Sequence, residues 1–231
     1  MAEPLLECRN LSAGYGQMAV VRNLDLEVNP GEVVALIGRN GAGKTTTLLT
    51  LAGDLAPIEG EVRLRGSVVK SSMHSRCRSG LGYLTEERSV IMKLTVADNL
   101  KLARVSVKAA TELFPELERL MRRQAGLLSG GEQQMLALAR ALGRRPEVLL
   151  ADELSLGLAP IVVSRLLKAV RAAADERGVG VLLVEQHVRQ ALAVADRVYV
   201  MNRGNAVLTG ASADIRGRLG EIEAAYLSSL A

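Results

Sequence analysis

The stretch Gly38-Arg39-Asn40-Gly41-Ala42-Gly43-Lys44-Thr45 decides the fold of this chain. It matches the phosphate-binding pattern G-x-x-x-x-G-K-[ST] in full. It also lies between an apolar run at residues 33–37 and an expected helix at residues 44–55, the context that the motif requires. Glycines let successive backbone N–H groups point inward around an anion, and the following helix offers its positive end to phosphate. A chance glycine-rich turn is a poor alternative when eight positions match in this context.

Two side chains of the stretch have expected roles at the phosphates. Lys44 brings a positive charge to the β- and γ-phosphates, and the Thr45 hydroxyl is placed to ligate Mg²⁺. Thr46 is either a second hydroxyl near the phosphates or an ordinary residue of the first helical turn.

Hydrophobic patterns on both sides of the stretch predict a mostly parallel α/β sheet. Leu24, Leu26 and Val28 alternate with acids, as in a half-buried strand, whereas residues 33–37 are continuously apolar, as in a buried parallel strand. Further strands are expected at residues 61–64, 148–151, 181–184, 197–201 and 206–209, and further helices at residues 161–174 and 188–195. Strands that alternate with helices are typical of α/β proteins.

Residues 87–145 differ from the rest because they read as mostly helix. Thr95 and Asp98 have the spacing of a capping box. One apolar helix face is predicted from Met135, Leu138, Ala139 and Leu142. We therefore expect a single domain over residues 1–231. It has a core at residues 1–86 and 146–231, a small N-terminal antiparallel sheet, and an α-helical subdomain at residues 87–145 inserted into the core.

The composition excludes several classes of function. The chain has 231 residues, of which 48% are hydrophobic, so it can bury a sizeable core. The net charge is only +4, and the basic cluster of Arg122, Arg123, Arg144 and Arg145 reads as a solvated face. With no Trp and one Phe, aromatic platforms for single-stranded nucleic acid are scarce. No nucleic-acid partner is expected.

Cysteine usage and hydropathy bear on the compartment. Cys8 and Cys77 form no C-x-x-C pair and read as reduced thiols. Glu3, Pro4 and Glu7 interrupt any signal-peptide core, and the apolar runs are of strand length, whereas a membrane span needs about 20 residues. We expect a cytoplasmic protein whose role at a membrane comes through a partner.

Two adjacent acids end a second apolar run. Asp152 and Glu153 follow residues 148–151, and ligands of α/β sheets lie at the carboxyl ends of strands. Asp152 is placed to hold Mg²⁺, directly or through water, and Glu153 to polarise a water for attack on the γ-phosphate. The alternative is that both acids only cap the next helix, and the nearby phosphate motif argues against it.

A third motif narrows the class. Leu128-Ser129-Gly130-Gly131-Glu132-Gln133 resembles the signature of ABC ATPases and lies between the two nucleotide motifs, as in that family. Taken alone, Ser129 and the glycines read as a helix start with Ser129 as its N-cap. The three motifs in this order make the chain resemble an ABC ATPase over nearly its whole length.

The resemblance implies how ATP is bound. In that family two subunits pair head to tail, and each ATP lies between the phosphate loop of one and the signature of the other, here Ser129-Gly130-Gly131-Glu132. ATP closes the pair and hydrolysis opens it, which drives a permease. Tyr15 matches the aromatic residue that stacks on adenine, the alternative being a partly buried tyrosine near a turn.

A narrower resemblance suggests the transported solute. Four segments recur in the smaller ATP-binding subunit of branched-chain amino-acid importers: residues 112–115, 131–137, 155–160 and 183–186. This implies two membrane permeases, a second ATP-binding subunit (alike or different), an extracytoplasmic solute-binding protein acting indirectly, and a location at the inner face of the cell membrane. Urea or short amides are alternative solutes.

Four positions depart from the common ABC pattern. Glu86 stands where most members have a glutamine, and it can still ligate Mg²⁺ or orient water. Gln186 stands in place of the switch histidine, and it cannot carry a proton; His187 serves only if the register slips by one. Ala159 and Leu154 replace a common aspartate and proline.

Two other functions stay open. A non-transport ABC ATPase usually carries coiled-coil insertions or two linked ATPase domains, for which 231 residues are too few. A non-hydrolysing regulatory module is disfavoured by Lys44, Asp152 and Glu153 and mildly favoured by Gln186 and Ala159. We expect an ATP hydrolase that binds ATP and Mg²⁺ and energises import of a branched-chain amino acid.

Overall fold

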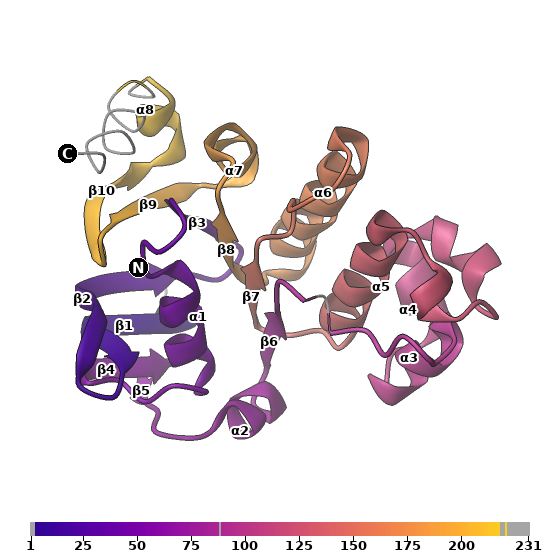
Figure 1. Ribbon diagram of the computed structural model, residues 1–231, viewed down its shortest axis with the longest axis horizontal. Helices are drawn as coiled ribbons and strands as arrows, with labels where there is room; N and C mark the ends of the chain where they lie inside the picture. The colour runs from indigo at the N-terminus through magenta and orange to yellow at the C-terminus, as the bar shows by residue number, and fades with distance from the viewer. Residues whose placement is uncertain (1–2, 88, 218–219, 221–231) are drawn as a thin grey trace.

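A computed structural model describes residues 3–87, 89–217 and 220. Its core is a six-stranded sheet in the order β10-β9-β3-β8-β7-β6 (Figure 1). The strands are β3 (Val33–Gly38), β6 (Leu81–Leu84), β7 (Val148–Asp152), β8 (Gly180–Glu185), β9 (Arg197–Asn202) and β10 (Asn205–Ala211). The first five are parallel, and β10 pairs antiparallel with β9. This confirms the α/β fold predicted from the sequence.

The register of the sheet places three functional segments side by side. Every residue of β3, β7 and β8 is buried, as expected of parallel strands covered on both faces. Ile37 of β3 pairs with Glu185 of β8, and Asp152 of β7 pairs with Val184. The phosphate loop, the two acids and the Gln186 segment therefore emerge at one edge of the sheet.

A second sheet covers one face of the first. It is four-stranded and antiparallel, in the order β2-β1-β4-β5, with β1 (Leu6–Tyr15), β2 (Met18–Val28), β4 (Glu59–Leu64) and β5 (Ser67–Val68). Leu24, Leu26 and Val28 are buried in it, which confirms the predicted alternation. One hydrophobic cluster joins this sheet, helix α1 (Lys44–Ala52) and the six-stranded sheet.

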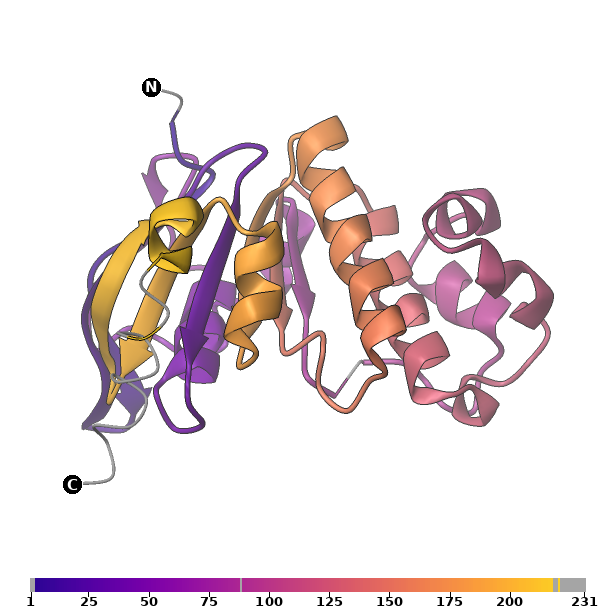
Figure 2. The same cartoon turned by 90° about the horizontal axis from the view of Figure 1, so that it is seen from above.

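Helices cover the opposite face. The larger hydrophobic cluster joins that face to α6 (Pro160–Arg177), α7 (Val188–Val194) and the helices between β6 and β7. Figure 2 shows how these helices are arranged beside the sheet. The helices between β6 and β7 are α3 (Val96–Leu102), α4 (Val107–Leu113), the 3-10 helices η1 (Pro115–Leu120) and η2 (Ala125–Leu127), and α5 (Gly130–Gly143). On α5, Met135, Leu138, Ala139 and Leu142 are buried, as predicted. The remaining helices are α2 (Met73–Arg78) and α8 (Ser212–Arg216).

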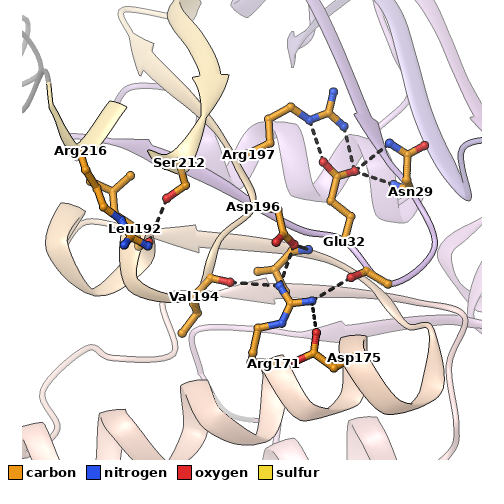
Figure 3. Close-up of polar contacts among 12 residues, drawn as sticks. Asn29, Glu32, Arg171, Asp175, Leu192, Val194, Asp196, Arg197, Ser212 and Arg216 are labelled. Atoms are coloured by element: carbon orange, nitrogen blue, oxygen red, sulfur yellow. Dashed lines mark hydrogen bonds and ion pairs between the residues drawn. The ribbon is translucent and has the colours of Figure 1, made fainter. Parts of the chain in front are cut away.

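A polar network secures the amino-terminal ends of the strands (Figure 3). Arg171 of α6 forms an ion pair of 2.7 Å with Asp196 and donates to Gly31 O at 2.9 Å and to Val194 O at 3.3 Å. Asp196 also accepts the Val33 N–H at 2.8 Å. Since Val33 begins β3 and the phosphate loop follows its end, the network fixes the strand that supports the loop.

Candidate nucleotide site

The backbone of the phosphate loop needs glycine at two positions. Gly43 has φ 100°, a left-handed conformation, and it is the N-cap of α1. A Cβ at Gly43 would lie 2.9 Å from Val21 Cγ2, and one at Gly38 would lie 2.7 Å from Met201 O. Glycine therefore lets the loop turn into the helix while packed against neighbouring strands.

Lys44 lies inside the loop. Its side chain is buried, and Nζ donates to Gly38 O at 2.8 Å and to Arg39 O at 3.1 Å. The same nitrogen is 3.7 Å from Glu153 Oε1. Burial lowers the pKa of Lys44, and the charges of Glu153 and Asp152 oppose this effect. The ammonium is thus held between the loop and the acids.

Asp152 ends β7 with its side chain almost fully buried. Burial raises the pKa of Asp152 to about 6, with a further contribution from Glu153, while a hydrogen bond with the Thr45 side chain opposes the rise. Among the described residues, its Oδ1 is buried and has no hydrogen-bond partner. An unpaired carboxylate oxygen beside a threonine hydroxyl is a donor set that suits Mg²⁺.

Glu153 and Gln186 face one another across the site. Glu153 has φ 48°, which a non-glycine residue seldom adopts, and its N–H donates to Val184 O at 3.0 Å. Gln186 Nε2 donates to both carboxylate oxygens of Glu153, at 2.8 Å and 2.7 Å. His187 Nδ1 instead lies 3.2 Å from Ser155 Oγ. In the structure it is therefore Gln186 that meets Glu153.

Part of the loop, Glu153 and Gln186 line one hollow of about 360 Å³, the phosphate hollow, whereas the buried Asp152 does not line it. Of the residues expected at the site, it contains Asn40, Gly41, Gly43, Lys44, Thr45, Thr46, Glu86, Glu153 and Gln186. Thr46 lies in the first turn of α1 as well as in the lining, so its two interpretations are compatible. Glu86 is exposed at the rim, and its charge also raises the pKa of Asp152.

Tyr15 lies in a different hollow. It lines a space of about 440 Å³ with Pro57 and Ile58, and its side chain is 56% exposed. The exposed ring is accessible to a planar ligand, but the phosphate hollow is not lined by it. Its stacking on adenine stays a prediction.

The signature segment also lies apart from the phosphate hollow. Ser129 Oγ accepts the Glu132 N–H at 3.3 Å, and Glu132 Oε2 accepts the Ser129 N–H at 2.8 Å, so the two residues form a capping box at the start of α5. The Ser129 N–H lowers the pKa of Glu132. A Cβ at Gly131 would meet Val162 at 3.0 Å. Within one chain this segment begins a helix and does not reach the phosphate hollow.

The structure adds Glu185 and Ser155, to which the sequence patterns assign no role at the site. Glu185, the last residue of β8, is 1% exposed and accepts two hydrogen bonds from Ser155. Burial raises the pKa of Glu185 to about 7. The sequence signal for Glu185 was an acid at the end of the apolar run 181–184, directly before Gln186.

Two of the positions that depart from the common ABC pattern have structural places. Leu154 is buried in the core, and Ala159 precedes α6 as its N-cap.

A phosphate loop between β3 and α1, with acids at the end of β7, defines a P-loop nucleoside-triphosphatase. The ABC transporter family model matches residues 21–155. The branched-chain amino acid transport ATP-binding protein BraG of Pseudomonas aeruginosa is 40% identical over 90% of this chain and 94% of that protein. LivF of Archaeoglobus fulgidus, named as a probable protein of the same kind, is 36% identical over 91% and 94%.

The chain belongs to the ABC transporter family, as an ATP-binding subunit that hydrolyses ATP. Lipopolysaccharide export ATP-binding protein LptB of Escherichia coli is 34% identical over 91% of this chain and 92% of that protein. A solved ATP-binding subunit of an ABC transporter superposes with a TM-score of 0.79 at 28% identity, over 98% of this chain and 97% of that one. In the part of the chain that the structure describes, no helix is long and apolar enough to cross a membrane.

Proposed function

We propose that this chain is the energy-coupling subunit of an importer for branched-chain amino acids, and that the hollow at the phosphate loop is its site of ATP hydrolysis. The observation that supports the site best is the convergence of Lys44, Glu153 and Gln186 around the space that phosphates would occupy. Gln186 Nε2 lies within 2.8 Å of both oxygens of Glu153, and Lys44 Nζ lies 3.7 Å from one of them.

In this proposal Glu153 takes a proton from the attacking water. The water oxygen bonds to the γ-phosphorus, and the bond from that phosphorus to the β–γ bridging oxygen breaks, releasing ADP and phosphate. Lys44 and the loop N–H groups stabilise the negative charge on the phosphates. Gln186 orients the carboxylate by donating to both of its oxygens, and it carries no proton itself.

Asp152, Thr45 and Glu86 are the proposed residues around Mg²⁺. The unpaired Oδ1 of Asp152 supports this role most directly, because a buried carboxylate oxygen without a partner costs free energy. Bound there, the ion would neutralise charge on the β- and γ-phosphates. Glu86 is exposed and lines the hollow with Thr45.

A second subunit, alike or different, is proposed to complete each site. Ser129, Gly130, Gly131 and Glu132 begin α5 away from the hollow of their own chain, so they would meet nucleotide only across a dimer. Glu132 would hold the segment through its capping box while the Ser129 hydroxyl and backbone N–H groups face the γ-phosphate. Tyr15, exposed in its own hollow, is the proposed adenine platform.

We propose that the permease docks at the inner face of the membrane, in a hollow of about 340 Å³ between α5, β6 and the end of α3. Four arginines line it: Arg78, Arg140, Arg144 and Arg145. The exposed side chain of Leu102 lies at the same hollow. A cytoplasmic permease segment that carries acids beside an apolar residue suits this lining. Arg144 and Arg145, two of the four arginines that the sequence pattern assigns to a solvated face, would then have a partner.

Uptake measured in cells tests the solute. A strain lacking this chain, given back the wild-type chain or Lys44→Ala, should import labelled leucine only with the wild type. Normal leucine uptake without the chain, together with loss of outer-membrane lipopolysaccharide, would favour export, the second candidate, which the similarity to LptB supports. Loss of urea uptake alone would point to the urea and amide relatives instead.

A further inference from the structure

Glu185 is a buried acid that the phosphate motif does not require. Its Oε1 accepts the Ser155 N–H at 3.1 Å, and its Oε2 accepts the Ser155 hydroxyl at 2.6 Å. Both side chains are nearly inaccessible, Glu185 at 1% and Ser155 at 4%. A buried carboxylate costs free energy unless its oxygens are hydrogen-bonded, so the two bonds from Ser155 are needed to keep Glu185 there.

These bonds hold a strained turn. Glu153, two residues before Ser155, has φ 48° and persists in that conformation only if its surroundings enforce it. The turn is attached to β8 at both ends, because Glu153 N–H donates to Val184 O at 3.0 Å and Ser155 donates to Glu185. The carboxylate of Glu153 thus takes its direction from β8.

Gln186 directly follows the same strand. Glu185 and Gln186 are consecutive, and each holds a different part of the turn. Glu185 accepts hydrogen bonds from Ser155, and Gln186 donates to the carboxylate of Glu153. Ser155 and Glu185 do not line the phosphate hollow. Their contacts link them to the reaction through the turn that carries Glu153.

His187 extends the arrangement. Its Nδ1 is 3.2 Å from Ser155 Oγ. When Glu185 is ionised, the Ser155 hydroxyl gives its one proton to that carboxylate, and the Nδ1–H tautomer of His187 would then donate to Ser155 Oγ. His187 is exposed to solvent, so its contact with Ser155 is expected to contribute less free energy than the buried bonds to Glu185.

We propose that Glu185 and Ser155 form a positioning clasp that sets the carboxylate of Glu153 for ATP hydrolysis. The inference rests on the proposed role of Glu153. Misplacement of a catalytic group by about 1 Å can cost two orders of magnitude in rate. Removing the clasp should therefore lower kcat while ATP binding, which depends on the phosphate loop and Lys44, is kept.

Steady-state ATP turnover and ATP affinity of the purified chain test this, with its partner subunits added if it is inactive alone. The variants are Ser155→Ala, Glu185→Leu, their combination, and Glu185→Gln. Ser106→Ala is the matched control, because Ser106 caps α4 away from the hollow. Glu153→Gln reports on the proposed function, and thermal unfolding reports on folding.

We expect Ser155→Ala and Glu185→Leu to lower kcat roughly tenfold or more with KM and ATP affinity within about twofold. The combination should be no worse than the poorer single variant, because the two residues act as a unit. Glu185→Gln should keep at least about a third of kcat, since the amide oxygen still accepts the Ser155 N–H. Ser106→Ala should match the wild type.

Three results would overturn the clasp. One is wild-type kcat in Ser155→Ala and Glu185→Leu while Glu153→Gln is inactive. The second is a Glu185→Leu variant that is unstable and loses kcat and ATP affinity in parallel, together with a Glu185→Gln variant that shows the same losses. The third is strictly additive effects in the combination. If Glu153→Gln itself turns over ATP at the wild-type rate, the proposed role of Glu153 is what fails.

Discussion

Glu185→Gln should reduce the dependence of stability on pH. Burial raises the folded-state pKa of Glu185 from the ordinary 4.5 to about 7. Between these values the folded chain binds more protons than the unfolded chain, so the free energy of unfolding falls as pH rises. The full effect of such a shift is about 3 kcal/mol, of which about three-quarters falls between pH 5 and pH 8. Glutamine does not titrate, so the variant lacks this contribution.

Urea unfolding of the wild type and of Glu185→Gln, at pH values from 5 to 8 without nucleotide, measures the effect. Burial also raises the pKa of Asp152, to about 6, and this second slope is common to both proteins. The difference between the two stability curves therefore isolates Glu185, and the variant should gain on the wild type as pH rises. Parallel curves, or a wild type that gains stability relative to the variant as pH rises, would show that burial does not dominate the pKa of Glu185.

Three more predictions concern the phosphate site. Lys44→Ala should weaken ATP binding roughly 10- to 150-fold, because hydrogen bonds to a charged group contribute free energy of that size. An equilibrium titration measures the affinity, and an unchanged value would contradict the placement of the Lys44 ammonium. Gly43→Ala should destabilise the chain by more than about 1 kcal/mol and abolish ATP binding, because its Cβ would meet Val21 at 2.9 Å. Gly41→Ala is its control, also at positive φ but with open space around the Cβ, and equal losses would contradict the steric argument. Chelating Mg²⁺ with EDTA should stop ATP turnover of the wild type. Turnover that persists in EDTA, or normal turnover of Asp152→Ala, would contradict the role of Asp152 as a Mg²⁺ ligand.

How far the sequence predicts the site depends on whether the signal is local. The phosphate loop and the acids of β7 were predictable, because each is a contiguous motif next to a buried strand. The end of the first helix was less so: α1 stops at Ala52, before residue 55, because Gly53 takes φ 88° and caps it.

Contacts between distant segments were not predictable in the same way. Ser155 and Glu185 are 30 positions apart and meet because β7 and β8 are parallel neighbours in a fixed register. The ion pair of Arg171 with Asp196 likewise depends on how α6 packs against the sheet. Gln186 was placed by resemblance, but its two bonds to Glu153 follow only from the folded chain.

In the proposed mechanism, Glu153 drives hydrolysis of an ATP that is held between two subunits. The most direct measurement is the mass in solution of Glu153→Gln with and without MgATP, beside the ATP turnover of the wild type with its partner subunits. We predict that MgATP converts the variant into a stable dimer, by itself or with a second ATP-binding subunit, and that the wild type hydrolyses ATP. A variant that binds ATP yet stays monomeric with every partner, beside a wild type without turnover, would contradict this mechanism and favour a regulatory nucleotide-binding module.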